Sequence, residues 1–317
     1  MNYLSVRDID SLSSWVAEAR KLKKDPFGFR HLGTDKTLGL LFFNPSLRTR
    51  LSSQKAAQNL GMNTMVMNFD KEGWALEFED GTVMDRGKSE HIKEAAGVIS
   101  QFCDIIGIRA FASLKDREKD ESELVLNGFA KHASVPIVNL ESSVGHPLQA
   151  LADAITLEEN KEHLHGKRPK VVLSWAPHPK ALPHAVANSF IGMMQQQEAD
   201  FVITHPRGYE LDPRIVGDSI VEYDQERAFE GADFIYSKNW SSYMNYGEVL
   251  SKDMSWRIDS EKMALTNHAK FMHCLPVRRN VVVADSVLDG TNSLVIEQAN
   301  NRTFSAQVVL KKILETL

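Results

Sequence analysis

Short apolar runs alternate with longer helical patterns along most of the chain, and this alternation restricts the fold more than any other feature. The runs are rich in β-branched or aromatic side chains and show little polar alternation, which predicts strands covered on both faces. The predicted strands are residues 37–43, 64–68, 104–109, 136–139, 170–175, 200–204, 233–236 and 270–274.

Between these runs, apolar side chains recur at helical spacing. The predicted helices are residues 11–21, 46–60, 91–101, 121–131, 147–159 and 183–195, with a last helix over 293–317 that no strand follows. Strands that alternate with helices predict an α/β fold built on parallel sheets.

Length and composition set limits on the class of protein. A chain of 317 residues is about twice the usual size of one domain, and the charged segment 158–169 marks the expected domain change. A net charge of −5 argues against a nucleic-acid partner. No apolar run approaches the ~18 residues of a membrane span, and no signal segment is evident, so we expect a cytoplasmic protein without a membrane partner. Two cysteines exclude a disulfide framework.

The segment FFNPSLRTR joins a predicted strand to a predicted helix. Pro45 is expected to begin the helix, which ends at Gly61. The first turn would then carry the run Ser46, Leu47, Arg48 and Thr49. Free N–H groups, the helix dipole and an arginine together favour an anion such as phosphate. The alternative is a plain helix cap with a solvated arginine.

A second helix start has a similar composition. In GHPLQALAD, Pro147 begins a helix, and His146 and Gln149 lie beside its N-terminus. Imidazole and amide groups can recognise a carboxamide, although a capping histidine is equally common. Arg109 ends another predicted strand, and a strand end in an α/β sheet is a usual place for a ligand. Cys274 ends a further strand, where a buried structural thiol is the alternative.

Neither a metal nor another cofactor is expected. The 11 histidines are scattered, and His163 and His165 have no carboxylate or thiol neighbours at ligand spacing. Trp74 lies in a polar stretch punctuated by glycines, which suggests an exposed or interface residue.

In chain order, FFNPSLRTR, GIR, HPLQALAD, HCLP and EQANNR resemble motifs of the aspartate/ornithine transcarbamoylase family. Together they span nearly the whole chain. The resemblance implies two doubly wound parallel-sheet domains. Residues 1–150, completed by the C-terminal helix at 293–317, would bind carbamoyl phosphate, and residues 151–292 would bind the amine substrate. It also implies a homotrimer with active sites at subunit interfaces.

The resemblance further implies roles for individual residues. Those expected to hold carbamoyl phosphate are Ser46, Leu47, Arg48, Thr49, Trp74, Arg109, His146, Gln149, Cys274, Leu275 and Arg302. Among them, His146 and Arg302 would polarise the carbonyl, and Cys274 would orient the amine and the carbamoyl group.

HCLPVRRN, YSKNWSSYMN and WAPHPKALP are similar to the N-acylornithine branch of that family, acetyl or succinyl. This branch implies arginine biosynthesis, a knotted second domain, and Trp74 in the site of a neighbouring subunit. The residues expected to contact N-acylornithine are Glu90, Glu141, His178, Lys238 and Arg278.

Glu90 stands where acetyl-type members carry glutamate and succinyl-type members carry proline, whereas the rest of the chain is more similar to the succinyl type. Because an ionised Glu90 would repel the carboxylate of a succinyl group, we predict that the chain prefers N-acetylornithine. Two alternatives remain open: a carbamoyltransferase for free ornithine, aspartate or a diamine, and a non-catalytic anion-binding protein on the same fold.

Overall fold

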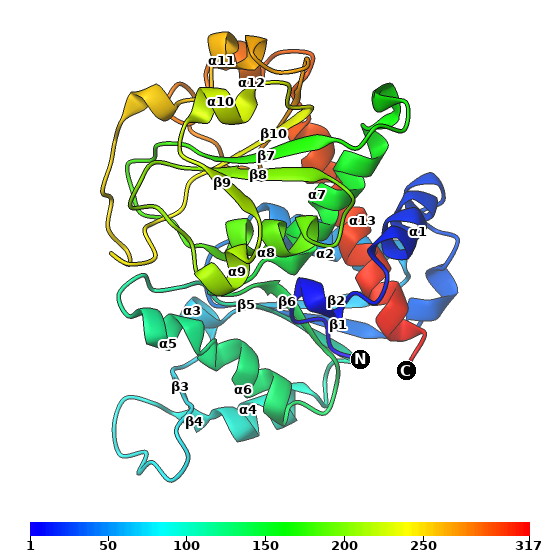
Figure 1. Ribbon diagram of the computed structural model, residues 1–317. Helices are drawn as coiled ribbons and strands as arrows, with labels where there is room; N and C mark the ends of the chain where they lie inside the picture. Colours follow the sequence, from blue (N-terminus) through cyan, green and yellow to red (C-terminus); the bar gives the residue numbers. More distant parts are fainter. The chain divides into compact units, whose positions relative to one another are not determined.

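The computed structural model describes the backbone of residues 1–317 and every side chain except those of Asp70 and His163. The chain forms two compact units, each with its own parallel sheet (Figure 1). Unit 1 comprises Met1–Leu148 and Arg302–Leu317, and unit 2 comprises Gln149–Asn301. In the part of the chain that is described, none of the helices combines the length and apolar character needed to cross a bilayer.

Unit 1 is built on a four-stranded sheet in the order β2-β1-β5-β6. Its strands are β1 (Thr37–Phe42), β2 (Asn63–Asn68), β5 (Ile105–Arg109) and β6 (Ile137–Glu141). A separate pair is formed by β3 (Leu76–Glu77) and β4 (Glu90–His91). The helices of unit 1 are α1 (Leu12–Lys24), α2 (Arg48–Asn59), α3 (Phe69–Glu72), α4 (Ile92–Ile99), α5 (Arg117–Glu121) and α6 (Leu124–His132), with 3-10 turns at Val6–Asp8 and Arg30–Gly33.

Unit 2 is built on a five-stranded sheet in the order β11-β10-β7-β8-β9. Its strands are β7 (Lys170–Trp175), β8 (Asp200–Thr204), β9 (Ile220–Glu222), β10 (Phe234–Lys238) and β11 (Lys270–Met272). Its helices are α8 (Ala185–Met194), α9 (Pro213–Val216), α10 (Gln225–Phe229), α11 (Ser260–Ala264) and α12 (Asp285–Leu288), with 3-10 turns at Glu162–Leu164 and Met254–Trp256.

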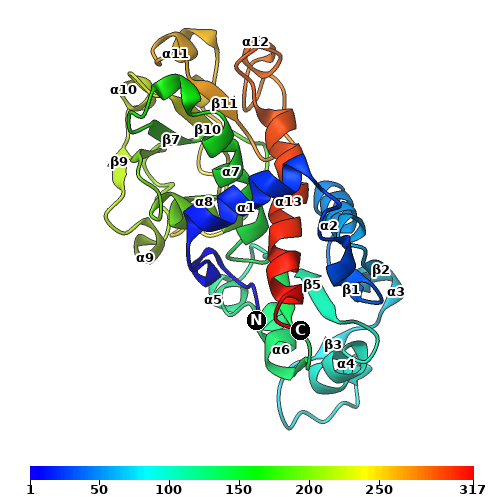
Figure 2. The ribbon, with the colours of Figure 1, turned by 90° about the vertical axis from the view of Figure 1, so that its right-hand side faces the viewer.

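Two long helices belong to both units. By residue number, one division between the units falls within helix α7 (Pro147–Glu159) and another within helix α13 (Val295–Leu314), both of which are labelled in Figure 2. The first two residues of α7 and the part of α13 from Arg302 onward belong to unit 1. This places both ends of the chain in unit 1.

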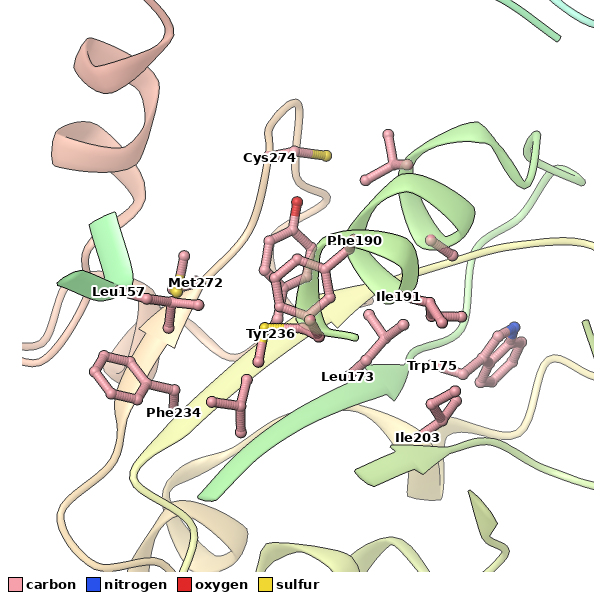
Figure 3. Close-up of a cluster of buried hydrophobic side chains, with 14 of the residues drawn as sticks. Leu157, Leu173, Trp175, Phe190, Ile191, Ile203, Phe234, Tyr236, Met272 and Cys274 are labelled. Atoms are coloured by element: carbon pink, nitrogen blue, oxygen red, sulfur yellow. The ribbon is translucent and has the colours of Figure 1, made fainter. Parts of the chain in front are cut away.

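The core of unit 2 shows why strand β7 reads as a continuous apolar run. Leu173 and Trp175 pack with Phe190 of α8 in one cluster of buried side chains (Figure 3). Val172, which points to the opposite face, packs with Phe229 of α10 in another cluster. Since both faces of the strand are covered, there is no polar alternation to mark it.

The predicted α/β architecture is confirmed, and each predicted strand and long helix has a counterpart in the structure. The start of α2 is the main correction. Pro45 and Ser46 were expected in the helix, but α2 begins at Arg48, and Ser46 lies in the preceding loop. The short strands β3, β4 and β9 were not predicted. The knot in the second domain, and the ligand assigned to each domain, stay predictions.

Gly61 ends α2 as the sequence predicts, with φ of 85°. A Cβ atom at this position would lie 2.3 Å from the carbonyl oxygen of Arg30. We expect Gly61→Ala to lower the free energy of unfolding by at least about 1–2 kcal/mol, the usual cost of left-handed backbone, with the clash in addition. Urea denaturation measures the change.

Gly97 provides the matched control, because it lies in helix α4 with open space around an added Cβ. Gly97→Ala should raise the free energy of unfolding by about 0.5–1 kcal/mol. Equal stability of Gly61→Ala and the wild type would contradict the argument.

Candidate active site

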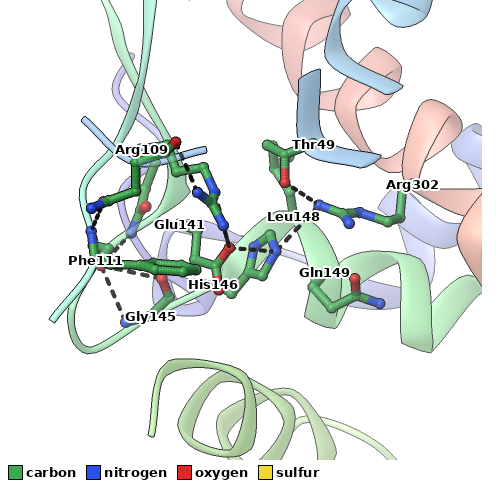
Figure 4. A network of polar contacts seen from close by, with 12 residues as sticks. Thr49, Arg109, Phe111, Glu141, Gly145, His146, Leu148, Gln149 and Arg302 are labelled. Carbon is green, nitrogen blue, oxygen red and sulfur yellow. Dashed lines mark hydrogen bonds and ion pairs between the residues drawn. The ribbon is translucent and has the colours of Figure 1, made fainter. Parts of the chain in front are cut away.

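A buried polar group lies where helix α13 meets the N-termini of α2 and α7 in unit 1 (Figure 4). Arg302 is 5% exposed, and its Nη2 atom donates to Oγ1 of Thr49 at 2.6 Å. The same Nη2 lies 3.3 Å from Nε2 of His146, which is 3% exposed. A guanidinium only donates, so the neutral form of His146 accepts this bond through Nε2. Helices distant in sequence thus bring three predicted site residues together.

Arg109 and Glu141 form an ion pair beside this group. They end the adjacent strands β5 and β6 and are paired in the sheet register. Glu141 Oε2 lies 3.1 Å from Nη2 of Arg109 and 3.2 Å from its Nε. The same carboxylate oxygen lies 3.5 Å from Nε2 of His146. Glu141 therefore lies between Arg109 and His146, as Figure 4 shows, but with an unprotonated Nε2 the contact with His146 is not a hydrogen bond.

Arg109 also explains why α2 begins later than the sequence suggests. Its Nη1 donates to the carbonyl oxygens of Asn44 and Pro45, at 3.1 and 2.6 Å. The Asn44 side chain accepts a bond from the Phe111 amide at 2.6 Å. These carbonyls serve Arg109 instead of accepting the N–H groups of a helical turn, so residues 44–47 form a loop.

The electrostatics of unit 1 favour an anion. Burial lowers the pKa of Arg109, Arg48 acts in the same direction, and Glu141 opposes them. The predicted site residues of unit 1 include three arginines, Arg48, Arg109 and Arg302. Beside them, Glu141 supplies one carboxylate, which pairs with Arg109, so positive charge is in excess. In the described part of the chain, no acceptor reaches the buried Nε of Arg48 at the start of α2. An unpartnered buried donor at a helix N-terminus suits an anionic ligand.

A second set of predicted residues is assembled within unit 2. Nε of Arg278 donates to Nε2 of His178 at 3.0 Å. Because that ring nitrogen accepts, the proton of a neutral His178 lies on Nδ1, which faces the Lys180 carbonyl at 2.8 Å. Burial lowers the pKa of His178, and the Arg278 and Lys238 cations lower it further. Lys238 Nζ donates to the carbonyl of Asn239. This set offers two cations and a neutral imidazole.

The segment that follows strand β11 adopts a strained conformation. Leu275 has a φ of 54°, which is unusual for a branched residue. Its amide donates to Nδ1 of His273 at 2.9 Å. Cys274 is a buried thiol that forms no disulfide, two residues beyond the end of the strand. The local bonds hold the backbone of this segment in one conformation.

Trp74 and Glu90 form a separate pair beside the two-stranded sheet of unit 1. The indole Nε1 of Trp74 donates to Oε2 of Glu90 at 2.8 Å. Trp74 is 57% exposed, as its sequence context suggests. This pair, rather than either residue alone, presents an apolar ring and a carboxylate at the surface.

Sequence reasoning missed several residues that organise these sites. It gave Glu141 no role toward Arg109, and Asn44 and Asp153 were not considered. The spacing of Gln149 and Asp153 was a usable signal, because residues i and i+4 are neighbours on a helix. Within the described residues, no cluster of three or more histidine, cysteine, aspartate or glutamate side chains could hold a metal ion, and the His163 side chain lies outside them.

Comparison with known proteins bears on the identity of these sites. Residues 2–159 match the carbamoyl-phosphate-binding domain of aspartate/ornithine carbamoyltransferases, and residues 183–313 match the Asp/Orn-binding domain. The chain is 53% identical to the N-succinylornithine carbamoyltransferase of Bacteroides fragilis (strain 638R), over 99% of both chains. It is 37% identical to the N-acetylornithine carbamoyltransferase of Xylella fastidiosa (strain Temecula1), over 98% of this chain and 97% of that one.

Solved structures give the same picture. The chain is similar to N-acetyl-L-ornithine transcarbamylase complexed with acetylcitrulline, with a TM-score of 0.91 and 35% identity over 99% of both chains. A variant of N-acetyl-L-ornithine transcarbamylase with one glutamate replaced by alanine matches with a TM-score of 0.92, at the same identity and coverage. That variant was solved with carbamyl phosphate and N-succinyl-L-norvaline.

Proposed function

Because the chain belongs to the aspartate/ornithine carbamoyltransferase family, we propose that it carbamoylates an N-acyl-L-ornithine and prefers the N-acetyl form. The enzyme transfers the carbamoyl group of carbamoyl phosphate to the side-chain amine, and the products are N-acyl-L-citrulline and phosphate. This reaction belongs to arginine biosynthesis. The observation that carries the assignment is the match to N-acylornithine carbamoyltransferases over nearly the full chain.

In this proposal, unit 1 supplies most of the groups that bind carbamoyl phosphate. Arg48 and the N-terminus of α2 would take the phosphate, and the unpartnered Nε of Arg48 supports that role. Arg302 and His146 would polarise the carbonyl. The remaining predicted contacts are Ser46, Leu47, Thr49, Trp74, Arg109, Gln149, Cys274 and Leu275.

The groups of unit 2 suit an N-acylated amino acid. Arg278 and Lys238 are cations that match the α-carboxylate. A neutral His178 can hydrogen-bond a substrate without adding charge. Since acylation removes the charge of the α-amine, the site needs no carboxylate to pair with it. Contacts of Glu141 and Glu90 with the acceptor are part of the proposal.

The chemistry follows from these groups. The side-chain amine of ornithine has an ordinary pKa near ~10.4, so the site must admit its neutral form before it attacks the carbonyl carbon. A new C–N bond forms, the C–O bond to phosphate breaks, and the amine loses one proton, which the departing phosphate can take up. Donors that polarise the carbonyl can each contribute roughly 3–4 kcal/mol, and correct orientation of the two reactants about 7–11 kcal/mol at best.

Glu90 supports the preference for the acetyl group. Its carboxylate is fixed by the bond from Trp74 and would lie near the acyl group of an acceptor bound to a neighbouring subunit. Succinyl ends in a carboxylate and would be repelled, whereas acetyl is neutral and shorter. The solved transcarbamylase variants in which a glutamate is replaced hold N-succinyl-L-norvaline, which agrees with a glutamate that opposes succinyl.

A carbamoylation assay with purified protein tests the assignment. Four acceptors at equal concentration are compared: N-acetylornithine, N-succinylornithine, ornithine and aspartate. Turnover should be highest with N-acetylornithine and negligible with ornithine and aspartate. Preferred use of free ornithine would refute the N-acyl assignment, and binding of carbamoyl phosphate without transfer to any acceptor would favour an anion-binding protein.

A homotrimer with shared sites is also proposed, in the cytoplasm, where thiols such as those of Cys103 and Cys274, which form no disulfide, stay reduced. Strand β2 is an edge strand that leaves two methionines exposed, and one leucine is exposed in helix α2 and another just before it. These side chains, together with Trp74, would suit a contact between copies of the chain. The exposed residues are Leu47, Leu51, Met65, Met67 and Trp74.

Mixed assembly tests whether sites are shared. If Trp74 completes the site of a neighbour that supplies Arg278, then Trp74→Ala and Arg278→Ala proteins should each lose nearly all activity. Trimers reassembled from both variants should regain a fraction of it, because some sites then contain both intact residues. No recovery in trimers verified as mixed would show that the two residues serve the same subunit.

A further inference from the structure

Asp153 is a fully buried carboxylate that binds two glutamine side chains within unit 2. It lies on α7, one turn after Gln149, and its exposure is 0%. The Oδ1 atom accepts a bond from Nε2 of Gln149 and a bond from Nε2 of Gln298, each at 2.7 Å. A glutamine amide can donate to a carboxylate through its nitrogen but not through its oxygen, so Asp153 determines which way both amides face.

The side-chain oxygens of the two glutamines differ in their hydrogen-bond partners. Oε1 of Gln298 accepts the backbone N–H of His273 at 2.9 Å. Oε1 of Gln149 is buried, and none of the donors among the described residues reaches it. A buried amide oxygen without a donor is costly, and such atoms are rare in folded proteins. The Gln149 oxygen is therefore ready to accept an N–H group from a ligand.

We propose that Asp153 is a positioning residue that keeps the oxygen of Gln149 toward the acyl group of the bound acyl phosphate, and thereby selects an NH2 group over a methyl group. The inference rests on the proposed function, in which Gln149 contacts carbamoyl phosphate. The carbamoyl NH2 donates to that oxygen. The methyl group of acetyl phosphate is not a hydrogen-bond donor, so it leaves the oxygen unsatisfied. Acetyl phosphate and carbamoyl phosphate carry the same phosphate group.

The bond from Gln298 also helps to hold Asp153 in place. The buried hydroxyl of Tyr236, on strand β10, has the Asp153 carboxylate and the Cys274 thiol as neighbours, and Figure 3 shows it directed toward Cys274. Burial and these two neighbours raise the pKa of Tyr236 well above its ordinary value, so the hydroxyl remains a donor. With Gln298 bound to His273, Asp153 is also connected to the segment that contains Cys274.

Calorimetric binding of three ligands to the full-length protein tests the proposal: carbamoyl phosphate, acetyl phosphate and inorganic phosphate. The wild type should bind carbamoyl phosphate at least about tenfold more tightly than acetyl phosphate, as expected for one buried hydrogen bond. Asp153→Ala removes the acceptor and should reduce this ratio to about threefold or less, while the affinity for inorganic phosphate changes little. Asp153→Asn keeps one acceptor oxygen and should retain most of the discrimination.

Two further variants separate positioning from packing. Thr156→Val changes another fully buried polar residue of α7, one that is bonded to Asn301 of α13, and should leave all three affinities unchanged. In a Gln149→Met background, Asp153→Ala should alter the ratio no further, because the amide through which it acts is absent. If Asp153→Ala does not fold, the ratio of the affinities for carbamoyl phosphate and acetyl phosphate is compared between the wild type and Gln149→Met. This ratio should be lower in Gln149→Met.

The possible failures are distinguishable. Equal affinity of the wild type for carbamoyl and acetyl phosphate, or an equal loss of all three affinities in Asp153→Ala, would overturn the positioning role alone. A wild-type protein that binds inorganic phosphate but not carbamoyl phosphate would overturn the proposed function as well.

Discussion

Replacing Arg302 by alanine is expected to lower kcat/KM for carbamoyl phosphate by about a hundredfold to a thousandfold, the usual effect of removing one donor to a developing oxyanion. The guanidinium is buried and bonds Thr49 beside His146. Its loss would remove a positive charge from the site and a bond that fixes the first turn of α2. Steady-state kinetics with N-acetylornithine at saturation measures the effect.

Lys312 is the matched control for this prediction. It lies on the same helix, ten residues further on, and forms an ion pair with Glu18 at 3.1 Å. Lys312→Ala removes an equal charge from α13 and should leave kcat/KM unchanged. Arg302→Lys should recover part of the lost activity, since it restores the charge without the planar set of donors. Wild-type kinetics in a folded Arg302→Ala protein would exclude a catalytic role.

Most of the long strands could be predicted because they are covered on both faces, whereas the edge strand β2 alternates exposed and half-buried residues. Strands such as β1 and β7 therefore appear as apolar runs that the sequence alone reveals. Strands β3 and β4 have two residues each, and β9 is partly exposed, so none of them gives a comparable pattern. Their pairing depends on contacts that are distant in sequence.

The site was predictable residue by residue but not contact by contact. Motifs indicated Arg109 and Glu141 separately, yet the ion pair between them follows from β5 and β6 being neighbours, and strand order is not visible in a motif. The late start of α2 has the same origin, because the carbonyls of Asn44 and Pro45 bind an arginine 64 or 65 positions away. Local helix signals cannot reveal such a competitor.

Glu90→Pro is expected to raise the ratio of kcat/KM for N-succinylornithine to that for N-acetylornithine by about fivefold to a thousandfold. A like charge at ~4 Å costs roughly 1 kcal/mol in water and roughly 4 kcal/mol at an effective dielectric near 20. Glu90 is partly exposed and its partner Trp74 more so, and solvent therefore screens the repulsion. We expect a change in the lower part of this range. Kinetics with both acceptors on both proteins provides the measurement.

Glu90→Gln separates charge from shape. The amide oxygen can still accept the indole N–H of Trp74, so the pair at the surface of unit 1 is kept while the charge is removed. If repulsion is the selector, Glu90→Gln should produce most of the gain for N-succinylornithine that Glu90→Pro produces. If only the proline variant gains, the shape of the backbone or the space beside Trp74 decides instead. A wild-type protein that already prefers N-succinylornithine would show that Glu90 does not select the acyl group, because the carboxylate held by Trp74 would then be directed away from it.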